Sequence, residues 1–143
     1  MRMFLSLNPP TATAQEKKVT IVRGRPIFFK PEKLKAAERE IIWNLRVHKP
    51  PVRLQGALEL KVKWLFPKGK LHKCNEWRVT RPDTDNLQKM LKDCMTEVGF
   101  WNDDAQVVRE VVEKRWIDDD FSGIDIEITE LGRFAEEKPN DDR

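Results

Sequence analysis

Apolar and polar residues alternate along residues 57–66 (ALELKVKWLF), where almost every second side chain is apolar. A period of two over this length predicts a strand with one buried face. Other apolar or alternating stretches cover residues 1–7, 19–22, 26–29, 106–117 and 124–129. An Arg-Gly-Arg sequence at 23–25 separates two of these stretches and is typical of a hairpin turn. The pattern therefore predicts four to six strands.

Two other stretches carry apolar residues at helical spacing. The first follows Pro31, ends before Pro50, and has the apolar positions Leu34, Ala37, Ile41 and Leu45. The second covers about residues 84–98, and its apolar stripe consists of Leu87, Leu91, Cys94 and Val98. Gly99 is well placed to end this helix. Two helices among several strands indicate an α/β chain of the α+β type, with a small mixed sheet and two main helices.

The length of 143 residues suits one domain. We expect this domain to cover residues 1–133 and the polar residues 134–143 to form a flexible tail. Hydrophobic residues make up 39% of the chain, which excludes disorder by composition, and no run approaches the ~20 apolar residues of a membrane span. The two cysteines have no metal-ligand spacing and provide no disulfide framework. These features predict a cytoplasmic protein without a membrane partner.

The formal net charge of +3 conceals an uneven distribution along the chain. Residues 1–80 hold 18 Lys and Arg against 6 Asp and Glu, whereas residues 81–143 hold 9 against 18. A basic half next to an acidic half suits a protein that binds nucleic acid through one and a divalent metal through the other. A solvated surface with segregated charges is the alternative. The candidate phosphate contacts lie in one basic loop: Lys68, Lys70, Lys73, Arg78 and Arg81.

Polar groups gather at the start of the second predicted helix. Pro82 favours an extended residue before it, so Asp83 stands at the helix entry and Asp85 in the first turn. Lys89 lies four residues after Asp85, on the helical face that points away from the apolar stripe. Asp83, Asp85 and Lys89 can therefore converge outside the core.

A third carboxylate could come from Asp103 or Asp104, which open the next strand. If that strand lies beside the end of the strand that leads toward Asp83, one of these acids joins the cluster. Packed carboxylates repel each other unless a cation compensates them. Oxygen ligands without His or Cys favour Mg²⁺ or Mn²⁺ over Zn²⁺, and such an ion can activate water toward a phosphodiester. Lys89 could then offset charge on the phosphate.

A structural interpretation of the same acids also stands. An aspartate at a helix start caps backbone amides and suits the helix dipole, and an Asp–Lys pair four residues apart needs no function. The sequence has no Gly-rich phosphate loop and no plausible Ser/His/Asp set, and His48 and His72 lie apart in basic segments.

With these residues in view, the sequence resembles the RusA family of Holliday-junction resolvases. The resemblance rests on D-x-D-N-L-x-K at residues 83–89 and on G-F-W-x-D-D-A-Q-V at residues 99–107. The ending I-x-I-T-E-x-G at residues 126–132 and the opening strand followed by Asn-Pro-Pro also fit, so the likeness extends to about residue 133.

The resemblance implies a small homodimeric endonuclease, of a kind common in phages and prophages. Such an enzyme binds four-way DNA junctions and nicks two strands symmetrically with a divalent metal. By position, the family's catalytic and metal-binding carboxylates fall on Asp83, Asp85 and Asp104, and its essential lysine falls on Lys89. Asp103 is a further candidate ligand. The expected cofactor is Mg²⁺, with Mn²⁺ as a possible substitute.

Other functions fit part of the pattern. A nuclease for flaps, forks or RNA would use the same chemistry. A junction-binding or phage regulatory protein without catalysis would use the acids as caps and surface charge. A PD-(D/E)xK nuclease fits less well, because its lysine belongs on a strand, whereas Lys89 is on a helix. Residues 1–7 and 124–129 are candidate edge strands for a dimer contact.

Overall fold

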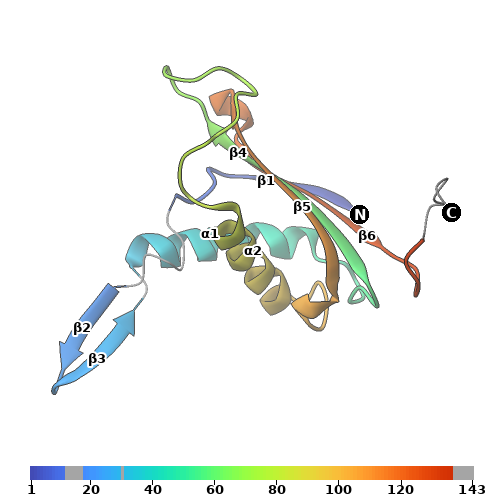
Figure 1. The fold of residues 1–143 in the computed structure, drawn as a ribbon, viewed down its shortest axis with the longest axis horizontal. Coiled ribbons are helices and arrows are strands. Elements are labelled where there is room, and N and C mark those ends of the chain that lie inside the picture. The colour runs from blue at the N-terminus through green and yellow to red at the C-terminus, as the bar shows by residue number, and fades with distance from the viewer. Residues whose placement is uncertain (12–17, 30, 137–143) are drawn as a thin grey trace, which may run out of the picture.

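The computed structural model describes residues 1–11, 18–29 and 31–136. It has two layers, a four-stranded sheet and a pair of helices on one face of that sheet (Figure 1). The helices are α1 (Glu32–His48) and α2 (Thr84–Val98). The strands are β1 (Arg2–Ser6), β2 (Lys18–Val22), β3 (Arg25–Phe29), β4 (Leu58–Pro67), β5 (Val107–Ile117) and β6 (Gly123–Glu130). Two single turns of 3-10 helix, η2 (Asp104–Gln106) and η3 (Asp119–Phe121), flank β5.

The four sheet strands lie in the order β1-β6-β4-β5. β6 is antiparallel to both of its neighbours, whereas β4 and β5 are parallel, with Trp64 opposite Lys114. Parallel neighbours need a crossover connection, and the loop of residues 68–83 with α2 supplies it. The expectation that residues 124–129 form an edge strand is wrong, because β6 pairs on both sides. β1, as expected, is an edge of this sheet.

Hydrophobic burial explains why the predicted elements form. The predicted apolar face of β4 is confirmed, since its alternate residues Leu58, Leu60, Val62, Trp64 and Phe66 are all buried. Both helices turn their apolar stripes to the same core, which includes Leu34, Ile41, Leu45, Leu87, Leu91 and Cys94. Trp64 is fully buried in this core, and its Nε1 donates a hydrogen bond of 2.7 Å to Oε1 of Gln88 on α2. The fold is thus the α+β arrangement of a mixed sheet with two helices.

The remaining expectations concern the ends and the hairpin. β2 and β3 form the predicted hairpin, which extends away from the sheet in Figure 1. Residues 137–143 of the expected tail lie outside the described residues, and the division of the chain at residue 133 stays a prediction. Cys74 is exposed and Cys94 is buried, and the two thiols are not joined in a disulfide. No helix in the described part of the chain is long and apolar enough to cross a bilayer.

Helix α2 ends at Gly99, which has the left-handed backbone angles φ 97° and ψ 34°. A side chain at such a residue is strained by roughly 1–2 kcal/mol, although a Cβ there would meet only the ends of Lys49 and Arg53 at ordinary contact distances. We expect Gly99→Ala to lower the free energy of unfolding by about 1–2 kcal/mol in urea titrations. Gly132→Ala, at a glycine with open space around it, is the control and should be neutral. Equal stability of the two variants would contradict this account of the helix end.

Glu59 on β4 gives the fold a pH dependence. It is largely buried and accepts a hydrogen bond from the guanidinium of Arg109 on β5, which together with the charges of Arg109 and Lys61 lowers the pKa of Glu59 despite desolvation. A carboxyl with a lowered pKa stabilises the fold above its ordinary pKa of 4.5, and this contribution is lost as the pH falls through the lowered value. We expect Glu59→Gln to be less stable than the wild type at pH 7, with a difference that shrinks below pH 4.5 in urea titrations. Glu130→Gln, at an exposed position of β6, is the control; a pH-independent difference for Glu59→Gln would contradict the assignment.

Candidate active site

Asp83 and Asp85 stand at the start of α2, as the sequence predicts. Asp83 is the N-cap residue with an extended backbone (φ −75°, ψ 149°), and its side chain makes no cap hydrogen bond. Asp85 lies in the first turn, where its Oδ1 accepts a hydrogen bond of 3.0 Å from the amide of Asn86. Both carboxylates are exposed. The capping role that could have explained Asp83 is therefore not made in this structure.

Lys89 follows one turn after Asp85. Its side chain is exposed, whereas Leu87 and Leu91 on the same helix are fully buried. A basic group and two acids thus occupy the solvent side of the first two turns of α2. This arrangement confirms the predicted placement of these groups outside the core; their roles stay a prediction.

Asp103 has a structural task at the other end of α2. Its carboxylate accepts a hydrogen bond of 2.8 Å from the amide of Ala105, and Gln106 returns the contact by accepting from the amide of Asp103 at 3.2 Å. This capping box begins η2. Asp104, the next residue, is half-buried and lies in the first turn of η2. Asp103 is thus already engaged by its own turn.

Within one chain, Asp104 does not lie close to Asp83 and Asp85. α2 separates them, and a helix of its 15 residues spans about 22 Å. β5 starts beside the start of β4, with Val107 opposite Leu58, so the turn before β5 lies at the opposite end of α2 from Asp83 (Figure 1). Within the described ranges, no group of three or more His, Cys, Asp or Glu side chains could hold a metal ion. The described part of one chain therefore does not hold the expected three-carboxylate cluster, and the assignment of these acids to a metal site stays a prediction. Strand β5, which follows Asp103 and Asp104, does lie beside β4. The two acids, however, are near the start of β4, whereas Asp83 belongs to the segment that follows its end.

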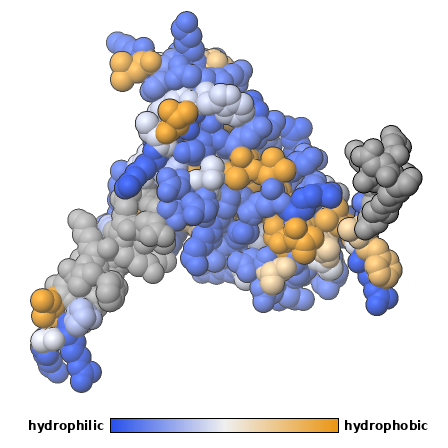
Figure 2. Space-filling view, in the orientation of Figure 1, coloured by the Kyte–Doolittle hydropathy of each residue, from blue (hydrophilic) through white to orange (hydrophobic). Residues whose placement is uncertain are grey.

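The basic loop of residues 68–81 packs against the far end of β5. Its backbone pairs with that strand through the amide of Asn75 with the carbonyl of Trp116 (2.7 Å) and the amide of Trp116 with the carbonyl of Glu76 (2.8 Å). The ring of His72 stacks on Trp116, with centroids 4.0 Å apart and an interplanar angle of 5°. In Figure 2 this upper part of the molecule is largely hydrophilic, with small separate apolar groups.

The five cations predicted to contact phosphates are not equivalent. Lys70, Lys73 and Arg81 are exposed, and Lys68 is half-buried. Arg78 differs, because its Cζ lies 4.2 Å from the ring centroid of Phe66 and 4.4 Å from that of Trp116. Burial lowers the pKa of Arg78, and its Nη2 donates a hydrogen bond of 2.6 Å to the carbonyl of Arg81. Arg78 is therefore engaged within the protein. The charges of Lys70, Lys73 and Arg81 are exposed to solvent, and that of Lys68 is partly so.

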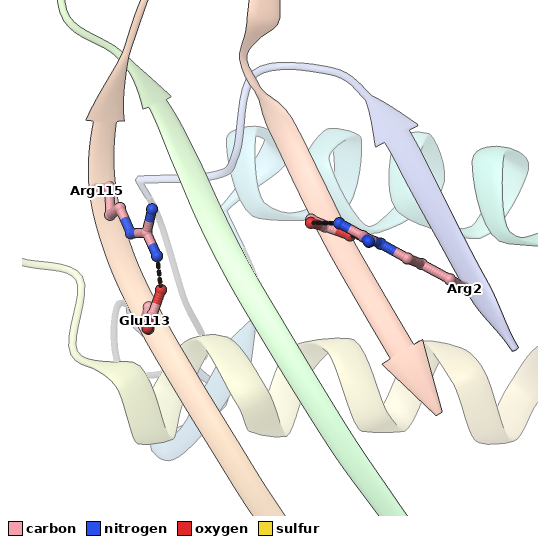
Figure 3. Close-up of polar contacts among 4 residues, drawn as sticks. Arg2, Glu113 and Arg115 are labelled. Carbon is pink, nitrogen blue, oxygen red and sulfur yellow. Dashed lines mark hydrogen bonds and ion pairs between the residues drawn. The ribbon is translucent and has the colours of Figure 1, made fainter. Parts of the chain in front are cut away.

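The sheet face without helices carries charges that the sequence patterns did not single out. Arg2 pairs with Asp125 at 2.9 Å, and Arg115 pairs with Glu113 (Figure 3). A hollow of about 350 Å³ on this face is lined by charged and apolar side chains: Arg2, Lys61, Val62, Lys63, Val111, Glu113, Asp125 and Glu127. Because acids and bases alternate there, this face is poorly suited to bind a polyanion.

A comparison with protein families decides what kind of chain this is. The sequence profile of the family described as "Endodeoxyribonuclease RusA" matches residues 8–129. The chain belongs to the RusA family. The resemblance drawn from the two acidic motifs is thereby confirmed.

Relatives within the RusA family differ in how much of the chain they match. A protein of Lactococcus phage r1t named "Crossover junction endodeoxyribonuclease rusA" is 29% identical over 127 residues, which cover 87% of this chain and 94% of the relative. A protein of Escherichia coli K12 with the same description is 46% identical over 52 residues, or 36% of this chain and 42% of the relative. A third, from Enterobacteria phage 82, matches over the same length at the same identity. RusA relatives of both phage and bacterial origin are therefore similar to this chain.

Proposed function

We propose that this protein is a structure-selective DNA endonuclease that resolves four-way junctions by paired, symmetric nicks with the help of Mg²⁺ or Mn²⁺. One observation carries the proposal: in a RusA family chain, two exposed carboxylates and a lysine share the solvent side of the first turns of α2, and Asp83 is not used as a cap. The names of the relatives, crossover junction endodeoxyribonucleases, support the same activity. In this proposal the protein acts on its DNA substrate in the cytoplasm.

The residues at the start of α2 fit a hard divalent cation. Asp83 and Asp85 offer carboxylate oxygens without a competing cap bond on Asp83, and oxygen donors suit Mg²⁺ and Mn²⁺. Two carboxylates outweigh the partial positive charge of the helix start, which by itself disfavours a cation there. When bound, the ion would supply an activated water and would offset charge on the phosphate.

The chain's own cations then position the DNA. Lys89 would hold a phosphate oxygen beside the two acids and compensate the charge that develops on it. In this proposal the exposed side chains of Lys70, Lys73 and Arg81 contact phosphates, and the half-buried Lys68 adds a further contact. Such contacts determine affinity and orientation rather than base sequence.

A homodimer completes the site in this proposal. Because α2 keeps Asp104 away from Asp83 and Asp85 within one chain, the third carboxylate comes from Asp104 of a second copy. A two-fold arrangement of two chains would then create two equal sites, which matches the approximate two-fold symmetry of a four-way junction and its paired nicks.

The first test compares a labelled four-way DNA junction with a plain duplex of the same arm sequence. Each is incubated with the protein and Mg²⁺, Mn²⁺ or a chelator, and products are read on denaturing gels. Paired, metal-dependent nicks in the junction alone are the expected result. Binding without cleavage would overturn the endonuclease proposal in favour of a non-catalytic junction-binding protein. Preferred cutting of flaps, forks or RNA would overturn the choice of substrate.

A further inference from the structure

The three residues that lead into Asp83 are held by two cations from different parts of the fold. Nζ of Lys114, on β5, donates hydrogen bonds of 2.7 Å to the carbonyl of Thr80 and of 2.7 Å to the carbonyl of Pro82. The guanidinium of Arg78 holds the carbonyl of Arg81 between them, through Nε at 3.2 Å and Nη2 at 2.6 Å. Every backbone carbonyl from residue 80 to residue 82 is thus engaged by a charged donor.

Both cations are themselves fixed. Lys114 lies opposite Trp64 in the parallel pair of β4 and β5, so its backbone is part of the edge strand of the sheet. The amide of Arg78 donates to the carbonyl of Lys114 at 3.1 Å, and the Arg78 guanidinium packs over the rings of both Phe66 and Trp116. The position of the segment before Asp83 is therefore determined by contacts with strand β5 of the sheet as well as by the loop itself.

A lysine at position 114 is costly for a merely structural bond. Burial and the nearby charge of Arg78 lower the pKa of Lys114, and the charge of Asp83 acts in the opposite direction. A neutral side chain could donate a hydrogen bond to one of these carbonyls, and it would not place a second positive charge beside Arg78. Lys114 instead reaches the carbonyls of two residues two positions apart, Thr80 and Pro82, and brings a positive charge near Asp83.

We propose that Lys114 is a positioning residue of the endonuclease site: by bridging the carbonyls of Thr80 and Pro82, it fixes the backbone from which the Asp83 carboxylate extends. This inference rests on the proposed function, since it takes Asp83 as a ligand of the divalent ion. The resemblance to the family pointed to the acids and to Lys89 of α2, whereas Lys114 emerges only from the contacts across β5. Supporting residues of this kind typically change metal affinity or activity by about 10–100-fold when removed.

The test replaces Lys114 with methionine, which keeps an unbranched side chain of similar length and removes both hydrogen bonds. We expect the Mg²⁺ concentration for half-maximal junction cleavage to rise by about 10–100-fold. The affinity for junction DNA in chelator should stay near that of the wild type, because the Lys114 ammonium is engaged within the protein by the carbonyls of Thr80 and Pro82. Lys114→Arg, which can still donate to two carbonyls, should recover part of the loss.

Two further readouts do not depend on cleavage. Binding of Mn²⁺ to the free protein, followed by its paramagnetic resonance signal, should weaken in Lys114→Met. Amide hydrogen exchange should become faster in a peptide that covers residues 79–87. Lys92→Met is the matched control, since Lys92 is a half-buried lysine that joins α2 to Glu110 of β5 at 3.1 Å without touching residues 80–82. It should alter thermal stability to a similar degree and leave both readouts unchanged.

The outcomes separate this inference from the function on which it rests. If Lys114→Met and Lys92→Met change only the melting temperature, and Mn²⁺ binding and exchange match the wild type, the positioning role is wrong. If the wild type does not cleave junctions, the proposed function fails, and the Mn²⁺ and exchange measurements still decide whether Lys114 orders the segment before Asp83. Should Lys114→Met fail to fold, Lys114→Gln takes its place in the same comparisons.

Discussion

Replacement of Asp85 by asparagine should lower the rate of junction cleavage by about two to three orders of magnitude. The variant keeps the size and shape of the side chain, and its remaining oxygen can still accept the hydrogen bond from the amide of Asn86. It loses one of the two charges that would hold the divalent ion, and the transition-state stabilisation that such an ion supplies is several kcal/mol. The fold should be unaffected, since Asp85 is exposed. The rate of strand cutting in Mg²⁺, measured with a labelled junction under single-turnover conditions, checks this expectation.

A binding measurement makes this result specific to catalysis. Asp85→Asn should bind the junction at least as tightly as the wild type in chelator, because it removes a negative charge next to a polyanion. Asp93→Asn is the control, since Asp93 is an exposed acid of the same helix away from its start, and it should cleave normally. Full cleavage by Asp85→Asn with a normal fold would exclude Asp85 from the reaction and would restore its interpretation as a helix-start charge.

The second large effect is recovery of activity when two inactive variants are mixed. Asp85→Asn and Asp104→Asn should each be inactive alone. In a mixed dimer whose sites combine Asp83 and Asp85 of one chain with Asp104 of the other, one site carries both substitutions and the other carries none. After co-refolding at equal amounts, about half of the dimers are mixed, so about a quarter of all sites should be intact. Because each mixed dimer has one working site, the product should be a singly nicked junction rather than resolved duplexes.

A second mixture controls for chain exchange. Asp83→Asn with Asp85→Asn places both substitutions in the same half of the site, so every site of the mixed dimer carries one substitution and no activity should return. Differently tagged chains, recovered together through one tag, establish that mixed dimers form in both experiments. If tagged mixed dimers of Asp85→Asn and Asp104→Asn form and remain inactive, the sites are not shared between chains in this way, and the route of Asp104 to the other acids must be reconsidered.

These expectations depend on one difference between sequence and structure. The motifs at residues 83–89 and 99–107 are close along the chain, and a short helix connects them, which favours the hypothesis that their acids meet. The tertiary structure opposes it, because the 15-residue helix α2 stands between the two motifs, and its two ends lie toward opposite ends of the same pair of strands. A motif gives residue types and spacing, whereas the distance between two motifs depends on the shape of what lies between them.

Local patterns determined most of the fold of this protein. Periodicity placed the α2 helix at residues 84–98 and the long strand at 57–66, because burial of one face imposes a period that a sequence shows directly. Gly99 marked the helix end, since a left-handed backbone favours glycine. The candidate acids and Lys89 were likewise visible from their spacing on one helix. These features involve neighbours along the chain, so the sequence alone was sufficient.

Only the tertiary structure decided which strands are neighbours and which polar groups meet. The place of β6 inside the sheet and the parallel pairing of β4 with β5 follow from packing between residues far apart in sequence, which no local period records. The same pairing brings Lys114 to the carbonyls before Asp83 and places Arg78 over two aromatic rings. It also separates Asp104 from Asp83. Such contacts depend on long-range geometry, because each side chain must first be placed by its own element before it can reach a partner on another.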